Sequence, residues 1–296
     1  MVAGPDGVAD ALVLLSEGDP DAAREALHRA GDDRLAPLLA SALDGDGALG
    51  GEVYVDPTAF QRFIDSPPNV ALYAAVEDGL ARWVAGEGSR VVDIGCGDGR
   101  VTKAVAPADA AVVELVEPAQ AMLDVAAARF PEQRVDAWCT DAETWTTTVL
   151  VDTPRDRDVG WSTFALHNLP SESRHEVLTS TAAGVGRFAV VEFDVPRFSA
   201  THEHAAYCSA RYRRGIEVHD DPLVVSGFLA PVLLGQFAPD APRHTYEQPL
   251  ETWANDLRRA GFVEVEVQTL HTDFWWAPAG MVTGRAPWAG TGRGST

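Results

Sequence analysis

The chain has 296 residues, 46% of them hydrophobic, and a formal net charge of −21 at pH 7. This length permits one large domain or two small ones, and the hydrophobic content suffices for a sizeable core. The acidic balance argues against nucleic acid as a partner, because binding a polyanion draws on clustered Lys and Arg. The sequence shows no apolar run of about 18 residues and no export leader, so we expect a cytoplasmic protein without a membrane partner.

The first 86 residues are expected to form a helical region. Residues 8–43 show two helical patterns, broken at Gly18-Asp19-Pro20 and at Gly31-Asp32-Asp33. A short extended segment is predicted at 53–57, and further helices over 58–64 and 71–85. Leucines recur along the first patterns, which predicts packing of these helices on one another or on a partner, as a lid or a dimerisation surface.

A glycine-rich run follows a predicted buried strand at 90–94. Gly95, Gly97 and Gly99 stand at alternate positions, with Asp93 directly before them and Asp98 among them. Glycine allows a sharp turn and close approach of a ligand to the backbone. The spacing differs from the Gly-x-Gly-x-x-Gly pattern of dinucleotide sites. Two carboxylates are also unsuited to a phosphate, and they favour a ligand with a cationic amine and sugar hydroxyls.

Strands and helices alternate after this turn, as in a doubly wound parallel sheet. Further strands are predicted at 111–116, 134–139, 158–164, 187–193, 262–270 and 281–285, with helices over 119–130 and 252–260. Glu117 ends the second strand about 20 residues after the glycines, where a carboxylate can accept hydrogen bonds from ribose hydroxyls. The alternative is a carboxylate that only starts the next helix, and Pro118 is compatible with both interpretations.

The motifs, in this order and spacing, resemble those of the class I S-adenosylmethionine (SAM)-dependent methyltransferases that act on small molecules. The resemblance covers residues 88–195 and 250–286. It implies an α/β fold with a seven-stranded, doubly wound, Rossmann-like sheet in a domain over 87–296, and SAM as the cofactor. The implied cofactor contacts are Asp93, Gly95, Gly97, Gly99, Glu117, Pro118, Asp141, Ala142 and Phe164.

Two segments after the glycine turn carry further implied roles. Asp141 fits the position that faces the adenine amino group in the family. Residues 165–170 correspond to a family segment beneath the cofactor and beside the acceptor pocket, although Asn168 replaces a second histidine. A long insertion, 196–249, is predicted to form a helical cap over the carboxyl ends of the strands, as a lid together with the N-terminal helices. The alternative is that these helices form a dimerisation surface, in which case the protein is a homodimer.

Methyl transfer from a sulfonium is an in-line displacement that needs alignment first and a base only for some acceptors. The candidate bases are His167, Glu192, Asp194, His202, His204 and His219. We favour His167 as the base and Glu192 as the anion that orients the acceptor, with Tyr207 of the cap as a further catalytic candidate. The alternatives are a histidine bound beneath the cofactor and carboxylates that cap a helix. The spacing of His202 and His204 does not suit a metal site, and none is expected.

The predicted function is methyl transfer from SAM to a small organic acceptor of a biosynthetic pathway. A phenol, an amine and an indole-like ring carbon all remain open as acceptors. One alternative is a catalytically silent SAM-binding interaction protein. Another is a nicotinamide-dependent oxidoreductase, which the glycine spacing and Asp98 disfavour.

Overall fold

The computed structural model describes residues 6–45, 57–86, 88–152, 156–241 and 245–289. It divides into two compact units. The helical unit combines residues 1–71, 197–245 and 273–276, and the sheet unit combines residues 72–196, 246–272 and 277–296. The extended segment predicted at 53–57 lies outside the described residues except for Pro57, which begins a helix.

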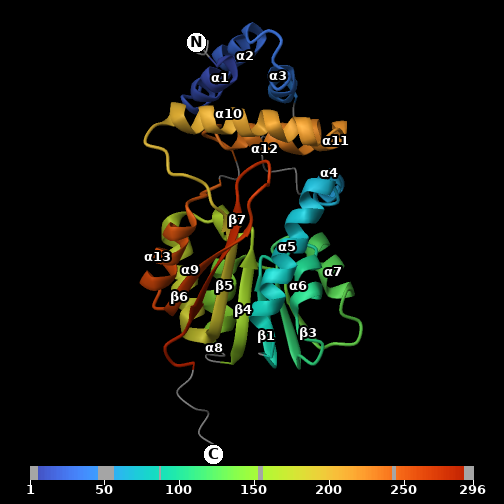
Figure 1. Ribbon diagram of the computed structural model, residues 1–296, viewed down its shortest axis with the longest axis vertical. Coiled ribbons are helices and arrows are strands. Elements are labelled where there is room, and N and C mark those ends of the chain that lie inside the picture. The colour runs from blue at the N-terminus through green and yellow to red at the C-terminus, as the bar shows by residue number, and fades with distance from the viewer. Residues whose placement is uncertain (1–5, 46–56, 87, 153–155, 242–244, 290–296) are drawn as a thin grey trace, which may run out of the picture. The chain divides into compact units, whose positions relative to one another are not determined.

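The sheet unit is built on seven strands in the order β3-β2-β1-β4-β5-β7-β6 (Figure 1). Their bounds are β1 Arg90–Ile94, β2 Val112–Val116, β3 Val135–Trp138, β4 Arg157–Thr163, β5 Val185–Phe193, β6 Val263–His271 and β7 Ala279–Arg285. Strands β1 to β5 are parallel, and β7 is antiparallel to both of its neighbours. The predicted seven-stranded, doubly wound sheet is therefore confirmed. The strand order reverses at β1, between β2 and β4, where sheets of this type bind ligands at the carboxyl ends of their strands.

Helices cover both faces of this sheet. On one face lie α8 (Ala142–Asp152), α9 (Ser171–Gly184) and α13 (Leu250–Arg259), which share a core with the strands. The largest side chains buried in that core are Trp145, Phe188 and Trp253. The opposite face carries α5 (Pro67–Val84), α6 (Arg100–Val105) and α7 (Gln120–Ala128) (Figure 1). Burial of both faces explains why the central strands are continuous hydrophobic runs.

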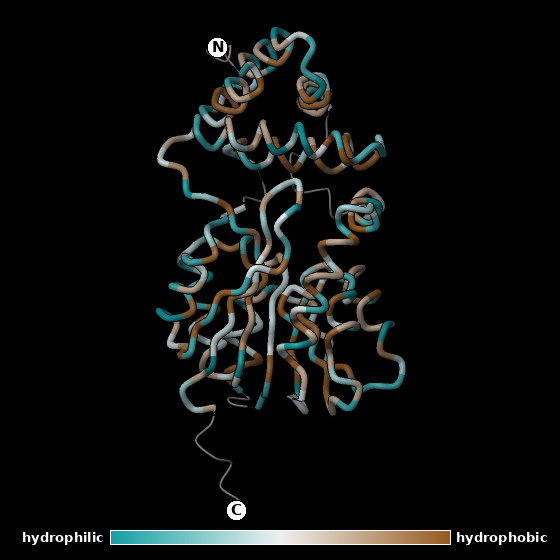
Figure 2. Tube along the Cα trace, in the orientation of Figure 1, coloured by the Kyte–Doolittle hydropathy of each residue, from teal (hydrophilic) through white to brown (hydrophobic). Residues whose placement is uncertain are grey.

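The helical unit contains seven α-helices within the described residues. They are α1 (Gly7–Ser16), α2 (Pro20–Arg29), α3 (Ala36–Asp44), α4 (Pro57–Ile64), α10 (Thr201–Val218), α11 (Pro222–Val224) and α12 (Ala230–Gly235), with a π-helical turn at Val225–Leu229 before α12. Hydrophobic and hydrophilic residues alternate along α10, as expected for a helix with one buried face (Figure 2).

The N-terminal region differs from the prediction in the number of its helices. Residues 8–43 were expected to give two helical patterns, but three helices form there. Gly31 takes a left-handed φ of 66°, which ends the second helix, and Pro37 in the first turn lets a third begin. Helix α5 also starts earlier than predicted, because Pro67 and Pro68 are both tolerated in a first turn.

No helix in the described ranges has both the length and the apolar stretch that crossing a bilayer requires.

Candidate functional site

The glycine turn after β1 is a tight loop between two packed neighbours. Gly95, Gly97 and Gly99 have φ angles of 76°, 53° and 72°, in the left-handed region that favours glycine. A Cβ on Gly95 would lie 2.4 Å from the Cβ of Ala165, and one on Gly99 would lie 2.7 Å from the Cβ of Ala126. Glycine is therefore required here for both its conformation and its size.

Asp93 is the last residue but one of β1, and it is 1% exposed. One carboxylate oxygen accepts a hydrogen bond from the Thr102 hydroxyl at 2.6 Å, whereas Oδ1 has no hydrogen-bond partner among the described residues. Burial raises the pKa of Asp93 to about 7, against the lowering effects of Thr102 and of the Trp161 side chain. A buried carboxylate oxygen without a donor fits a ligand that brings its own, such as the amine of SAM.

Asp98 has a different role from Asp93. Its Oδ2 lies 2.6 Å from Nη2 of Arg129, and its Oδ1 accepts a hydrogen bond from the backbone N–H of Arg100 at 3.1 Å. Arg129, at the end of α7, also donates to the carbonyl of Asp98. The second acidic residue of the motif thus holds the loop against α7.

Glu117 joins the glycine turn to the segment that precedes α7. Its Oε2 accepts from the backbone N–H of Gly97 at 3.1 Å, and its Oε1 accepts from the N–H of Ala119 at 3.0 Å, at the start of α7. The carboxylate therefore lies at the glycine turn and holds the residue that precedes α7, and its contact with the ribose stays a prediction. Pro118 follows it, and its carbonyl accepts a weak hydrogen bond from the Cys139 thiol.

The end of β3 leads directly into α8. Asp141 caps this helix, since its Oδ1 accepts from the N–H of Thr144 at 2.7 Å, and its side chain is exposed. Ala142 is the first residue of α8 and is half-buried. β3 lies next to β2, so Asp141 follows the strand adjacent to the one that ends before Glu117.

Phe164 follows β4 in a conformation that non-glycine residues rarely adopt, with φ of 50°. Its ring stacks on Phe193, with centroids 4.5 Å apart, and meets the edge of Tyr73 at 6.1 Å. All three rings are partly exposed. Strained residues cluster at ligand sites, where the surrounding structure stabilises them. Phe193 was not among the predicted site residues, because only the pairing of β4 with β5 reveals its contact.

His167 and Glu192 are brought together by the same pair of strands. The distance between Nδ1 of His167 and Oε2 of Glu192 is 2.8 Å, and the backbone N–H of His167 donates to Oε1 at 3.1 Å. Glu192 is 1% exposed, on β5, and His167 lies in a single 3-10 turn after β4. The carboxylate thus fixes both the ring and the backbone of the histidine.

The other candidate bases are placed elsewhere. Asp194 accepts from the N–H of Leu250 at the start of α13, which is the capping role. Tyr207 belongs to the helical unit, where its hydroxyl donates to the carbonyl of Trp276 at 3.2 Å. His204 stacks on Phe198 and burial lowers its pKa. Burial lowers the pKa of His219 as well.

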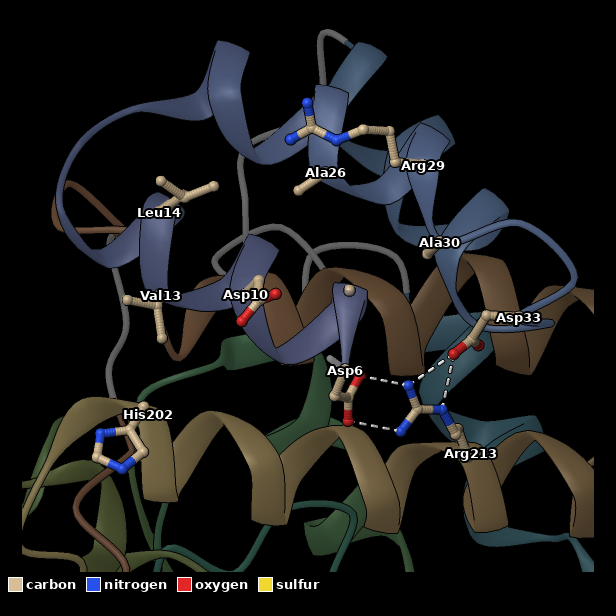
Figure 3. A pocket seen from close by; sticks show the side chains of 11 residues that line it. Asp6, Asp10, Val13, Leu14, Ala26, Arg29, Ala30, Asp33, His202 and Arg213 are labelled. Carbon is tan, nitrogen blue, oxygen red and sulfur yellow. Dashed lines mark hydrogen bonds and ion pairs between the residues drawn. The ribbon is translucent and has the colours of Figure 1, made fainter. Parts of the chain in front are cut away.

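A separate hollow of about 770 Å³ lies within the helical unit (Figure 3). Its walls come from α1, α2 and α10, and its ionisable side chains are Asp6, Asp10, Arg29, Asp33, His202 and Arg213. Arg213 binds Asp6 through two hydrogen bonds of 2.6 and 2.9 Å and also pairs with Asp33 at 2.6 Å. These ion pairs tie three chain segments together, so this side of the hollow serves the packing of the unit.

Comparisons with known proteins extend this description. A family model described as "Methyltransferase domain" matches residues 91–185. Comparison with curated protein sequences gave no match. Among solved structures, the fold is similar to a Burkholderia thailandensis 1,6-didemethyltoxoflavin-N1-methyltransferase, with 18% identity, a TM-score of 0.52, and coverage of 79% of this chain and 85% of that one.

Two further solved structures share the fold. The SAM-dependent methyltransferase SibL has 18% identity, a TM-score of 0.54, and coverage of 95% of this chain and 74% of its own. The N-methyltransferase NodS from Bradyrhizobium japonicum has 14% identity, a TM-score of 0.51, and coverage of 86% and 100%. These solved structures show a shared fold, the family model identifies a methyltransferase domain over residues 91–185, and the glycine turn with Asp93 and Glu117 fits SAM as the cofactor of that domain.

Proposed function

We propose that this enzyme methylates a hydroxyl or ring N–H group of a small aromatic metabolite, with His167 as the base and Glu192 as its orienting anion. The observation that carries the proposal is the 2.8 Å contact between Nδ1 of His167 and Oε2 of Glu192. SAM supplies an activated methyl group on a sulfonium, which already carries the leaving group and the positive charge.

The hydrogen bond to Glu192 selects one tautomer of His167. If Nδ1–H donates to the carboxylate, Nε2 keeps its lone pair and can accept a proton from the acceptor. The carboxylate then stabilises the protonated ring that results. A base of this kind contributes about 10²–10⁴-fold to a rate, and alignment of the acceptor contributes the rest. Acceptors that must lose a proton benefit from this arrangement, which supports a hydroxyl or ring N–H.

The aromatic side chains at the ends of β4 and β5 support a planar acceptor. Phe164 and Phe193 stack at 4.5 Å, and Tyr73 meets Phe164 edge-on. Aromatic faces bind flat rings by offset stacking and edge contacts. The Burkholderia enzyme was crystallised with 1,6-didemethyltoxoflavin bound, which gives this fold a precedent for a small-molecule acceptor. An amine-bearing acceptor is the alternative.

We also propose that the helical unit helps to select the acceptor, with Tyr207 as a contributor. Within the helical unit, the Tyr207 ring lies among other aromatic rings, with centroid distances of 5.1 Å to Phe198 and 5.4 Å to Trp276. The homodimer is the alternative role for these helices, and sedimentation of the full chain measures it.

The first experiment identifies an acceptor and then tests the base. The full chain is incubated with SAM and a panel of phenols, hydroxylated or N–H heteroaromatics, and amines, and release of S-adenosylhomocysteine (SAH) is measured. With the acceptor that reacts, His167→Gln should lower kcat by about 10²-fold or more while SAH binding stays intact. His28→Gln, a change at an exposed position of α2, is the matched control.

Three outcomes contradict the proposal. Near-normal kcat of His167→Gln across the pH range shows that no base acts at this position and that alignment suffices. Turnover of amines alone, with none of the aromatic hydroxyl or N–H compounds reacting, assigns a different acceptor. SAM binding without turnover of any compound favours the silent SAM-binding protein.

A further inference from the structure

A buried arginine lies behind the loop that carries His167. Arg174, on α9, is 2% exposed, and its guanidinium stacks over the ring of Trp253 at 4.4 Å. A charge is buried at this depth only where its hydrogen bonds and its counter-ion are arranged for it. The proposed chemistry assigns no role to this residue.

The guanidinium joins two segments that are far apart in the sequence. Nη1 donates to the carbonyl of Leu169 at 3.3 Å, at the end of the His167 loop. The same nitrogen donates to the carbonyl of Tyr246 at 3.2 Å, and Nη2 donates to Oε1 of Gln248 at 3.0 Å. Residues 246–248 are the first of the sheet unit after the helical-unit segment 197–245.

The second of these segments holds His167 directly. The backbone N–H of Tyr246 donates to the carbonyl of His167 at 2.6 Å. Arg174 therefore supports the His167 loop at Leu169 and, through Tyr246, at His167 itself. Together with the backbone bond from His167 to Glu192, this fixes the loop on both sides.

The counter-ion of Arg174 is part of the same network. Oδ2 of Asp256 lies 3.5 Å from Nε of Arg174 and accepts a hydrogen bond from Nε2 of Gln248 at 2.7 Å. A guanidinium donates in several fixed directions, whereas a lysine ammonium is a compact point charge. Only the arginine fork can reach Leu169, Tyr246 and Gln248 while it pairs with Asp256.

We propose that Arg174 is a positioning residue for methyl transfer, which fixes the backbone of His167 so that its imidazole stays on Glu192. The inference rests on the proposed function of His167 as the base. Arg174 acts through backbone and charge and needs no contact with the substrate.

The positive charge of Arg174 predicts an effect on the protonation of His167, which can be measured apart from catalysis. The carboxylates around His167 and its supports are Glu192 on β5, Asp194 on the same strand and Asp256 on α13. Arg174 is the cation that opposes them. Its removal should favour the protonated form of His167, because the negative charge around the ring is then less compensated.

The test is a titration of His167 by NMR, which needs no acceptor. The chain has eight histidines, and the signal of His167 is the one lost in His167→Gln. Arg174→Gln should move the titration midpoint of His167 to higher pH by roughly half to one unit, less than the 1–3 units of a charge in direct contact. Arg174→Lys keeps the charge and should leave the midpoint in place.

Kinetics supply the second readout. Arg174→Lys loses the fork, so its kcat with the acceptor from the panel should fall about 10- to 100-fold, as expected for a misplaced catalytic group. SAH affinity should stay within twofold, about the spread of such measurements. Gln248→Met removes one acceptor of the fork but keeps the charge, and it provides a milder variant if Arg174→Gln does not fold.

Arg187 provides the matched control. It lies on β5, donates to the carbonyl of Trp83 at 3.1 Å and stacks over the Trp83 ring at 4.6 Å. Arg187→Gln and Arg187→Lys should leave both the His167 titration and kcat unchanged. If they reproduce the effects of the Arg174 variants, Arg174 is merely structural.

The two proposals fail separately. Unchanged kcat and an unchanged His167 titration in both folded Arg174 variants overturn the positioning role, even when His167→Gln is inactive. Normal turnover of His167→Gln overturns the base, and the NMR titration then still decides whether Arg174 controls the ring.

Discussion

At the end of β1, Asp93 carries a carboxyl group that the fold itself does not satisfy. Burial raises the pKa of Asp93 to about 7, and no donor in the described part of the chain reaches its Oδ1. A carboxyl group whose pKa is raised on folding holds its proton in the folded state after the unfolded chain has lost it. Its contribution to stability therefore falls as pH rises from about 4 to 7 and stays low above that range. The same group is available for a cationic ligand.

Asp93→Asn should consequently stabilise the ligand-free protein and weaken cofactor binding. The free energy of unfolding at about pH 8 should rise by on the order of 1–3 kcal/mol, with a smaller gain at about pH 5. Denaturant unfolding at both pH values and calorimetry with SAH measure the two effects. Asp98→Asn is the control, and it should lose stability because Asp98 pairs with Arg129 at 2.6 Å. A loss of stability in Asp93→Asn at pH 8, or an unchanged SAH affinity, would contradict this role.

Among the elements, α1, α10 and the turn before α3 are tied together by Arg213. Burial acts to raise the pKa of Asp6, but hydrogen bonds from Arg213 and Ser209 outweigh it and hold this pKa well below its usual range. A carboxylate with a lowered pKa contributes stability above its unfolded pKa of about 4, and this is lost as pH falls through the folded pKa. Asp6 also caps α1 by accepting from the N–H groups of Val8 and Ala9.

Arg213→Leu should destabilise the helical unit by about 1–2 kcal/mol at neutral pH, because both partners are partly exposed and water screens the pair. The difference from wild type should shrink as Asp6 is protonated at strongly acidic pH. Amide hydrogen exchange in α1 reports the change locally, and exchange in β1 of the sheet unit is the internal control. Equal loss of protection in both elements would show that the effect is not confined to the helical unit.

The sequence predicted the helices and strands more accurately than the contacts between residues that are distant in the chain. The strands lie within two residues of their predicted bounds, because β-branched runs end at glycine, proline or acidic residues. The helix predicted over 252–260 forms as α13, and Gly261 after it has a left-handed φ of 100°. Local signals missed the third N-terminal helix, and no local pattern joins Arg174 to Tyr246 or Phe164 to Phe193. Such contacts depend on strand pairing and on how the chain returns after the insertion.

In the whole molecule, almost all residues predicted to bind the cofactor or to take part in catalysis belong to one of the two units. Every residue predicted to contact the cofactor, together with His167 and Glu192, lies in the sheet unit, whereas Tyr207 lies in the helical unit. The predicted cofactor contacts come mostly from one turn and the ends of two strands, which local sequence patterns reveal. The residues proposed to act on the acceptor come from distant parts of the chain, which no local pattern connects. Cofactor binding should therefore tolerate substitutions in the helical unit.

The central claim is that the glycine turn and Glu117 form a SAM site, and calorimetry with SAH and with NAD tests it most directly. The account predicts that SAH binds and NAD does not. It also predicts that Glu117→Ala weakens SAH binding by ~1.5–3 kcal/mol, the scale of a hydrogen bond to a charged group. Tight NAD binding without an SAH signal would contradict the assignment. Full SAH affinity in a folded Glu117→Ala variant would show that Glu117 does not bind the cofactor and serves only at the start of α7.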